Sequence, residues 1–178
     1  MSSPVKAAFL DRDGTLIEEQ NYLNDPTMVR LFPGTVPALM ELKKKGFLLF
    51  VVSNQSGVAR GFITPQQLTA VNDELNRQLL EHGVSLDDAF YCVHAPPAVS
   101  ACRKPGTGLI PKTWHGAEID YSKSIVVGDK LLDLDLGKNL GARSFLVLTG
   151  YGETTRTKLP EGHRFSVVRD LAAAAAKA

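Results

Sequence analysis

The alternation of short apolar runs with helix-like segments constrains this 178-residue chain more than any other feature of its sequence. Five apolar runs have the length and composition of buried strands, at residues 7–10, 47–52, 89–93, 125–127 and 144–148. Helix-like segments separate most of them. Strands that alternate with helices build a parallel sheet, so the pattern predicts a Rossmann-like, three-layer α/β fold with helices on both faces.

Four helices are expected, at residues 37–45, 65–82, 108–117 and 131–140, and the alanine run at residues 172–176 is expected to end a fifth. The second has the clearest boundaries. Thr64 can cap it, Pro65 can occupy its first turn, and Gln67 completes a capping-box pattern. Its apolar residues recur at helical spacing, which predicts an inward-facing stripe.

The composition is that of an ordinary soluble globular protein, with 44% hydrophobic and 22% charged residues. A chain of this length accommodates one domain with a real core, so residues 1–178 are expected to form a single domain. The net charge of +1 gives no reason to expect a nucleic-acid surface. No apolar run is long enough to cross a membrane, no signal peptide is evident, and two cysteines make no disulfide framework. A cytoplasmic monomer is therefore the expectation.

Polar residues follow the expected strands at the points where those strands end. Asp11 and Asp13 follow the first strand, and Ser53 follows the second. Lys104 lies past the third, and Asp129 follows the fourth. In an open parallel sheet, ligands bind outside the carboxyl ends of the strands, so these side chains are expected to converge. Each could instead be a turn residue, a helix cap or a solvated charge, and only their co-occurrence favours a site.

The order of these motifs resembles that of the haloacid dehalogenase superfamily of phosphohydrolases, over residues 7 to about 150. The motifs are Asp11-Arg12-Asp13-Gly14-Thr15, then Ser53, then Lys104, then Gly128-Asp129 with Asp133 four residues on. Each motif alone is a weak signal, whereas four in order at expected strand ends are specific. The resemblance implies Mg²⁺-dependent hydrolysis of a phosphomonoester.

The resemblance also implies a role for each residue. Asp11 would attack phosphorus to form an aspartyl-phosphate, and Asp13 would protonate the leaving group and later activate water. Ser53 would donate a hydrogen bond to the phosphoryl group, and Lys104 would stabilise its charge. Mg²⁺ would offset the repulsion between carboxylate and phosphate, held by the Asp11 side chain, the Asp13 carbonyl and Asp129.

Two further expectations concern the surroundings of these residues. Asp133 is either a partner of Lys104 or a first-turn acid favoured by the helix dipole. The gaps before and after Ser53 hold only a short flap, two helices and a strand, which leaves no room for a separate cap domain. The site is therefore expected to be open, with loops selecting the substrate.

Those loops look like the loops of the D-glycero-D-manno-heptose 1,7-bisphosphate phosphatases. The resembling segments are residues 53–61, 91–94, 102–105 and 128–130. The resemblance implies substrate contacts from Asn54, Gln55, Arg60, Arg103 and Lys130, with the flap at residues 19–22 as a weaker candidate. Extra cations suit a substrate with a second phosphate. The alternatives are a histidinol-phosphate phosphatase, a phosphatase for another sugar phosphate, and a catalytically silent phospho-ligand binder.

The family pattern also includes a four-ligand loop for a structural Zn²⁺, and this chain departs from it. Cys92, His94 and Cys102 match three of the ligands, whereas Ser100 occupies the fourth position. Structural zinc sites are usually closed and four-coordinate. The loop could hold zinc with water as the fourth ligand, or it could have lost its metal and be stiffened by residues 96 and 97. Its length is closer to that of the histidinol-phosphate branch.

Overall fold

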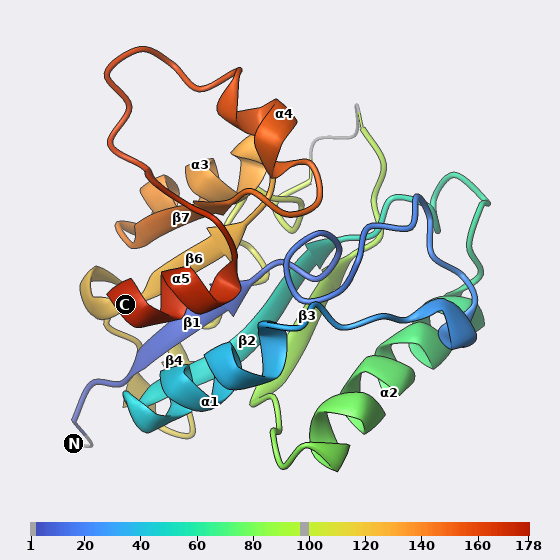
Figure 1. Cartoon of the computed structure of the whole chain (residues 1–178), viewed down its shortest axis with the longest axis horizontal. Helices are drawn as coiled ribbons and strands as arrows, with labels where there is room; N and C mark the ends of the chain where they lie inside the picture. The colour runs from blue at the N-terminus through green and yellow to red at the C-terminus, as the bar shows by residue number, and fades with distance from the viewer. Residues whose placement is uncertain (1–2, 97–99) are drawn as a thin grey trace.

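The computed structural model describes residues 3–96 and 100–178, so residue 97, one of the two expected to stiffen the loop, lies outside the described part. Its centre is a six-stranded sheet in the order β3-β2-β1-β6-β7-β8, in which every neighbouring pair is parallel (Figure 1). The strands are β1 (Lys6–Leu10), β2 (Phe47–Asn54), β3 (Asp88–Cys92), β6 (Ile125–Gly128), β7 (Arg143–Val147) and β8 (Ser166–Val168). The five expected strands are all present. The short edge strand β8 was not expected, because three residues carry too little apolar pattern.

The helices that flank the sheet are α1 (Thr35–Lys44), α2 (Pro65–Glu81), α3 (Leu131–Leu140), α4 (Gly152–Arg156) and α5 (Leu171–Lys177). Two short 3₁₀ turns lie at Pro26–Met28 and Tyr121–Lys123. The expected capping box of α2 is confirmed: the Thr64 hydroxyl accepts from the Gln67 amide, and the Gln67 side chain accepts from the Thr64 amide. Helix α3 ends at Gly141, whose φ of 74° is the left-handed conformation that glycine adopts without strain.

Each face of the sheet has its own apolar core. Helices α1, α2 and α5 cover one face, and α1 packs directly against α5 in front of the sheet in Figure 1. Alternate strand residues supply this core, including Ala8 and Leu10 of β1. Ala7 and Phe9 point to the opposite face, where they meet Leu136 of α3. This alternation follows from the two-residue period of a strand, and it confirms the three-layer α/β fold.

The helix expected at residues 108–117 is wrong. That region holds a two-stranded antiparallel hairpin, β4 (Thr113–Trp114) and β5 (Ala117–Glu118). The spacing of Ile110, Trp114 and Ala117 imitates a helix. However, His115 and Gly116 both have positive φ, 46° and 80°, as in the tight turns that join paired strands. Trp114 packs edge-on against Phe50 at 5.0 Å between ring centroids, so this hairpin covers the second face beside α3.

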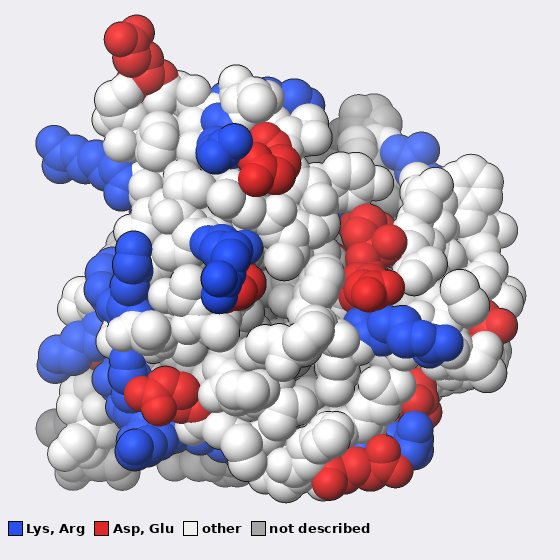
Figure 2. Space-filling view, in the orientation of Figure 1, with Lys and Arg blue, Asp and Glu red and all other residues white. Residues whose placement is uncertain are grey.

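Two absences hold within residues 3–96 and 100–178. No folded unit stands above the carboxyl ends of the strands, as expected for an architecture without a cap. No helix there is long and apolar enough to cross a membrane. Figure 2 shows acidic and basic side chains interspersed over the face with α1 and α5, in line with the small net charge.

Candidate active site

The carboxyl ends of the central strands surround a solvent-open cavity of about 220 Å³. The strand order runs outward in both directions from β1 and β6, so the cavity lies at the switch point of the sheet. It is lined by residues at and beyond the carboxyl ends of four strands: Asp11, Arg12 and Asp13 after β1, Ser53, Asn54 and Gln55 at the end of β2, Arg103 and Lys104 after β3, and Lys130 and Asp133 after β6. Residues far apart in the sequence thus meet as expected. Arg60 does not line the cavity.

Lys104 is the buried cation at the floor of the cavity. Its Nζ lies 2.7 Å from Asp11 Oδ1 and 2.6 Å from Asp133 Oδ1, and it donates to the Val52 carbonyl at 2.6 Å. Of the two interpretations of Asp133, the structure therefore shows the contact with Lys104. Asp133 also accepts from the Lys130 amide, so it acts as a first-turn acid of α3 as well.

Asp11 and Lys104 each stabilise the ionised form of the other. Burial disfavours ionised Asp11, but Lys104 and Lys130 outweigh burial and lower the Asp11 pKa below its ordinary value. Burial likewise opposes charge on Lys104, and the carboxylates of Asp11 and Asp133 outweigh it and raise the Lys104 pKa. Asp11 is therefore a carboxylate, the form that can act as a nucleophile.

Asp129 follows β6 and is fully buried, with a carboxylate oxygen within 4.8 Å of one of Asp11. Its Oδ2 accepts from the Tyr151 amide at 2.7 Å. Its Oδ1 accepts no hydrogen bond from any residue that the structure describes, although Lys130 Nζ is 3.2 Å away. Burial, together with the charge of Asp11, raises the Asp129 pKa to about 7. An orphaned carboxylate oxygen beside a second carboxylate is a fit for a hard cation.

The backbone around Asp129 leaves space only for its carboxylate. A Cβ at Gly14 or Gly150 would lie 2.2 Å and 2.3 Å from Asp129 Oδ2, so only glycine fits at both positions. Ligand atoms of Asp11, Asp129 and Asp133 all lie within 4.8 Å of one another. The set contains oxygen donors only, which suits Mg²⁺.

Asp13 is held by two side chains at the edge of the cavity. Arg12 donates to both of its carboxylate oxygens, from Nε at 3.1 Å and from Nη2 at 3.0 Å. Gln55 Nε2 donates to Asp13 Oδ2 at 2.7 Å and to Ser53 Oγ at 2.9 Å. Gln55, expected to contact substrate, thus links the acid/base candidate to the phosphate-binding candidate.

Lys130 bridges the cavity to the flap that follows β1. Its Nζ is 3.2 Å from Glu19 Oε2, and these contacts and the charge of Asp11 outweigh burial and raise the Lys130 pKa. Tyr22 of the same flap packs against Phe62 at 4.8 Å between ring centroids. The flap therefore borders the cavity, and substrate contact from residues 19–22 stays a prediction.

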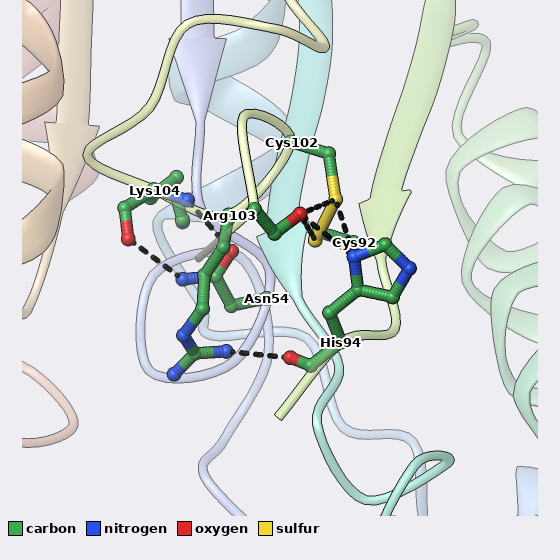
Figure 3. The surroundings of a disulfide bond; sticks show 7 residues. Asn54, Cys92, His94, Cys102, Arg103 and Lys104 are labelled. Carbon is green, nitrogen blue, oxygen red and sulfur yellow. Dashed lines mark hydrogen bonds between the residues drawn. A yellow bond between two sulfur atoms is a disulfide. The ribbon is translucent and has the colours of Figure 1, made fainter. Parts of the chain in front are cut away.

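The Arg103 side chain lines the outer part of the cavity, away from Lys104. Its guanidinium donates to the His94 carbonyl at 3.1 Å, and the Asn54 side chain holds the backbone of Lys104 on both sides (Figure 3). Burial and the nearby charge of Arg60 lower the Arg103 pKa. Arg60 is exposed outside the cavity, yet two guanidinium groups are close enough to repel each other.

The two cysteines form a disulfide, which was not expected from their number. Cys92 at the end of β3 is bonded to Cys102, one residue before Arg103 (Figure 3). The Ser100 hydroxyl lies 2.7 Å from His94 Nδ1 and 3.0 Å from the Cys102 sulfur. Zinc needs free thiolates, so in this state the three sequence-matched residues do not fit it.

Sequence reasoning missed two contributors to the site. Arg12 was given no role in the motif, although a cation between two acids is a readable signal. Tyr151 reaches Asp129 through its backbone amide, which no side-chain pattern could reveal.

Two family models match the chain. A model described as polynucleotide kinase 3 phosphatase matches residues 6–132, and one described as HAD-hydrolase-like matches residues 101–174. Among curated relatives, D-glycero-beta-D-manno-heptose-1,7-bisphosphate 7-phosphatase of Haemophilus influenzae is 37% identical over 83% of this chain and 87% of its own. The protein of the same name from Escherichia coli K12 is 38% identical over 84% of this chain and 83% of its own.

Solved structures agree with these relatives. The D,D-heptose 1,7-bisphosphate phosphatase of B. bronchiseptica, complexed with magnesium and phosphate, has a TM-score of 0.86 at 34% identity, with 97% of both chains covered. The enzyme of the same name from Burkholderia thailandensis has a TM-score of 0.74 at 30% identity, also with 97% of both chains covered. With these matches across nearly its whole length, the chain belongs to the haloacid dehalogenase-like phosphatases, in the family of the D-glycero-D-manno-heptose 1,7-bisphosphate phosphatases.

Proposed function

We propose that this enzyme hydrolyses the C7 phosphomonoester of D-glycero-D-manno-heptose 1,7-bisphosphate through an aspartyl-phosphate. The observation that carries the proposal is the buried, ionised Asp11, which Lys104 holds at 2.7 Å at the base of an open cavity. A carboxylate at the base of a cavity lined by cations is positioned to attack the phosphorus of a bound phosphate.

In the first step, Asp11 attacks phosphorus and the bond from phosphorus to the C7 oxygen breaks. Asp13 gives its proton to the departing oxygen. In the second step, water attacks the aspartyl-phosphate, Asp13 takes the proton of that water, and phosphate leaves from Asp11. Ser53 donates its hydroxyl to a phosphoryl oxygen, and Lys104 stabilises the charge that moves between carboxylate and phosphate.

Mg²⁺ would be held by Asp11, Asp129 and the Asp13 carbonyl, where it would supply charge neutralisation between the nucleophile and the phosphoryl oxygens. The support is the orphaned Asp129 oxygen and the cluster of carboxylate oxygens of Asp11, Asp129 and Asp133, which lie within 4.8 Å of one another. The magnesium and phosphate in the B. bronchiseptica enzyme are consistent with this assignment.

The substrate assignment is supported by the cations at the mouth. Lys130 lines the cavity, and Arg103 and Arg60 lie close enough for their charges to oppose each other. An anion between them would relieve that repulsion, and the 1-phosphate of a bisphosphate is such an anion. Histidinol phosphate instead carries a cationic amine, which these groups would repel. The names of the curated relatives point to the β-anomer.

Replacement of the nucleophile tests the reaction. Asp11→Asn is expected to abolish turnover and leave no acid-stable phosphoenzyme, while the far-UV circular dichroism stays that of the parent. Asp73→Asn, at an exposed position of α2, is the matched control and should keep full activity. Undiminished turnover by Asp11→Asn would overturn the nucleophile assignment.

Comparison of substrates tests the specificity. We expect kcat/KM to be highest for the β-anomer of heptose 1,7-bisphosphate, lower for the α-anomer and lowest for histidinol phosphate. A preference for histidinol phosphate would reverse the assignment. A chain that binds these phosphates without turnover would instead be a phospho-ligand binder.

We further propose that residues 1–178 act as a monomer in the cytoplasm and form a single domain. The single domain is supported by the six-stranded sheet, whose two faces carry the cores. Reducing conditions in the cytoplasm would free the thiols of Cys92 and Cys102. Elemental analysis of protein purified with a dithiol therefore tests the metal loop. We expect no stoichiometric zinc, because Ser100 replaces a ligand. One zinc per chain would restore the three-ligand site.

A further inference from the structure

Arg12 is the largest side chain that is fully buried in the described part of the chain, with 1% of its surface exposed. A buried guanidinium is costly unless its donors are paired. All three of its nitrogens have acceptors here. Nε and Nη2 hold Asp13 as a two-pronged fork, and Nη1 donates to Asn72 Oδ1 at 2.6 Å.

The far side of Arg12 is also fixed. Asn72 lies on α2, and the Tyr91 ring on β3 lies 6.0 Å from the guanidinium carbon. Burial raises the Tyr91 pKa to about 12, so this ring stays neutral at working pH. The Arg12 carbonyl accepts from the amides of Leu16 and Ile17, which winds the following turn around it. Arg12 therefore cannot turn to follow a mobile partner.

We propose that Arg12 is a positioning residue, which fixes the orientation of the Asp13 carboxylate for its two proton transfers and is itself fixed by Asn72. This inference rests on the proposed function, in which Asp13 gives a proton in one step and takes one in the next. A side chain that serves two steps must stay at the same place while the leaving group departs and water arrives. Misplacement of a catalytic group by about 1 Å can lower the rate by about 10²-fold.

The rates of the two steps distinguish a positioning role for Arg12 from a purely structural one. An aryl phosphate such as p-nitrophenyl phosphate has a leaving group that needs no proton, so its first step does not depend on Asp13. Misplacement of Asp13 should then slow only the hydrolysis of the aspartyl-phosphate. A general loss of structure would slow both steps and leave little phosphoenzyme.

The experiment compares Arg12→Lys and Asn72→Ala with the parent and with Asn76→Ala, a matched control on an exposed position of α2. We expect kcat for p-nitrophenyl phosphate to fall about 100-fold in Arg12→Lys and about tenfold in Asn72→Ala. KM should fall with kcat, so that kcat/KM stays unchanged, because only the second step is slowed. Acid-quenched phosphoenzyme should rise in both. Asn76→Ala should match the parent. Should Arg12→Lys not fold, Asn72→Ala decides the test.

A double-mutant cycle completes the test. If Arg12 acts through Asp13, Arg12→Lys should add no further loss once Asp13→Asn is present. An additive loss, or parent-like kcat and phosphoenzyme in Asn72→Ala, would overturn the positioning role while leaving the proposed function intact. Turnover by Asp11→Asn would instead remove the proposed function itself.

Discussion

At the scale of single residues, the site is a balance of buried charges. Lys104 lies between Asp11 and Asp133, within 2.7 Å of each, and all three are almost fully buried. A buried ion pair is retained only where each charge has a partner, since an unpaired one is strongly destabilising. The same lysine that would stabilise the moving phosphoryl charge therefore also stabilises the folded site.

Lys104→Met tests whether Lys104 contributes to both turnover and stability, unlike a lysine on the surface. We expect turnover to fall by at least about 10³-fold and unfolding free energy to fall by about 3 kcal/mol, because two buried carboxylates lose their cation. Lys112→Met, at an exposed position, is the control and should change neither. Chemical denaturation and steady-state kinetics measure both effects. Unchanged stability of Lys104→Met would contradict the charge balance.

At the scale of elements, the region that joins β3 to β6 shows how local pattern can mislead. Ile110, Trp114 and Ala117 have helical spacing, yet the chain forms the hairpin of β4 and β5. The hairpin places the Trp114 ring against Phe50. A helix in the same place would have to make this contact from a different backbone conformation. Tertiary packing on the sheet thus prevails over a weak local preference.

Gly116→Ala distinguishes the two structures by the sign of its effect. In a helix the change would raise stability by about 1 kcal/mol. In this turn φ is 80° and the space around the glycine is open, so backbone strain alone should lower stability by about 1 kcal/mol. Thermal unfolding measures the difference. A higher Tm for Gly116→Ala would contradict the hairpin.

At the scale of the whole molecule, the parallel sheet brings acids from β1 and β6 together. Their mutual repulsion lowers the stability of the folded protein unless a cation or a proton offsets it. Burial and the charge of Asp11 raise the Asp129 pKa to about 7, against an ordinary value of 3.8. Folded protein thus keeps a proton that the unfolded chain loses as pH rises. The contribution of Asp129 to stability is present below the lower value and is lost as pH rises toward 7.

Mg²⁺ should recover that loss, because it binds the ionised carboxylate in place of the proton. We expect the stabilisation on addition of Mg²⁺ to chelated protein, measured as a rise in Tm, to be small at pH 5 and to grow up to about pH 8. At a hundredfold excess over Kd, the free energy of unfolding should rise by roughly 3 kcal/mol. Asp129→Asn should show little gain at any pH. A Mg²⁺ effect that is independent of pH, or greater at low pH, would contradict this linkage.

The sequence alone determined the α/β architecture and the identity of the acids at the strand ends. Strand-length apolar runs that alternate with helices are typical of a covered parallel sheet, and such a sheet places Asp11 and Asp129 at one edge. The capping box of α2 was readable for a similar reason, since Thr64 and Gln67 act within one turn.

Other features were decided only by the tertiary structure. The hairpin in place of a helix, the Cys92–Cys102 disulfide and the Arg12 fork with its support from Asn72 all depend on which segments meet in space. Local pattern carries the physics of one element, whereas these contacts arise from desolvation and packing between elements that are distant along the chain.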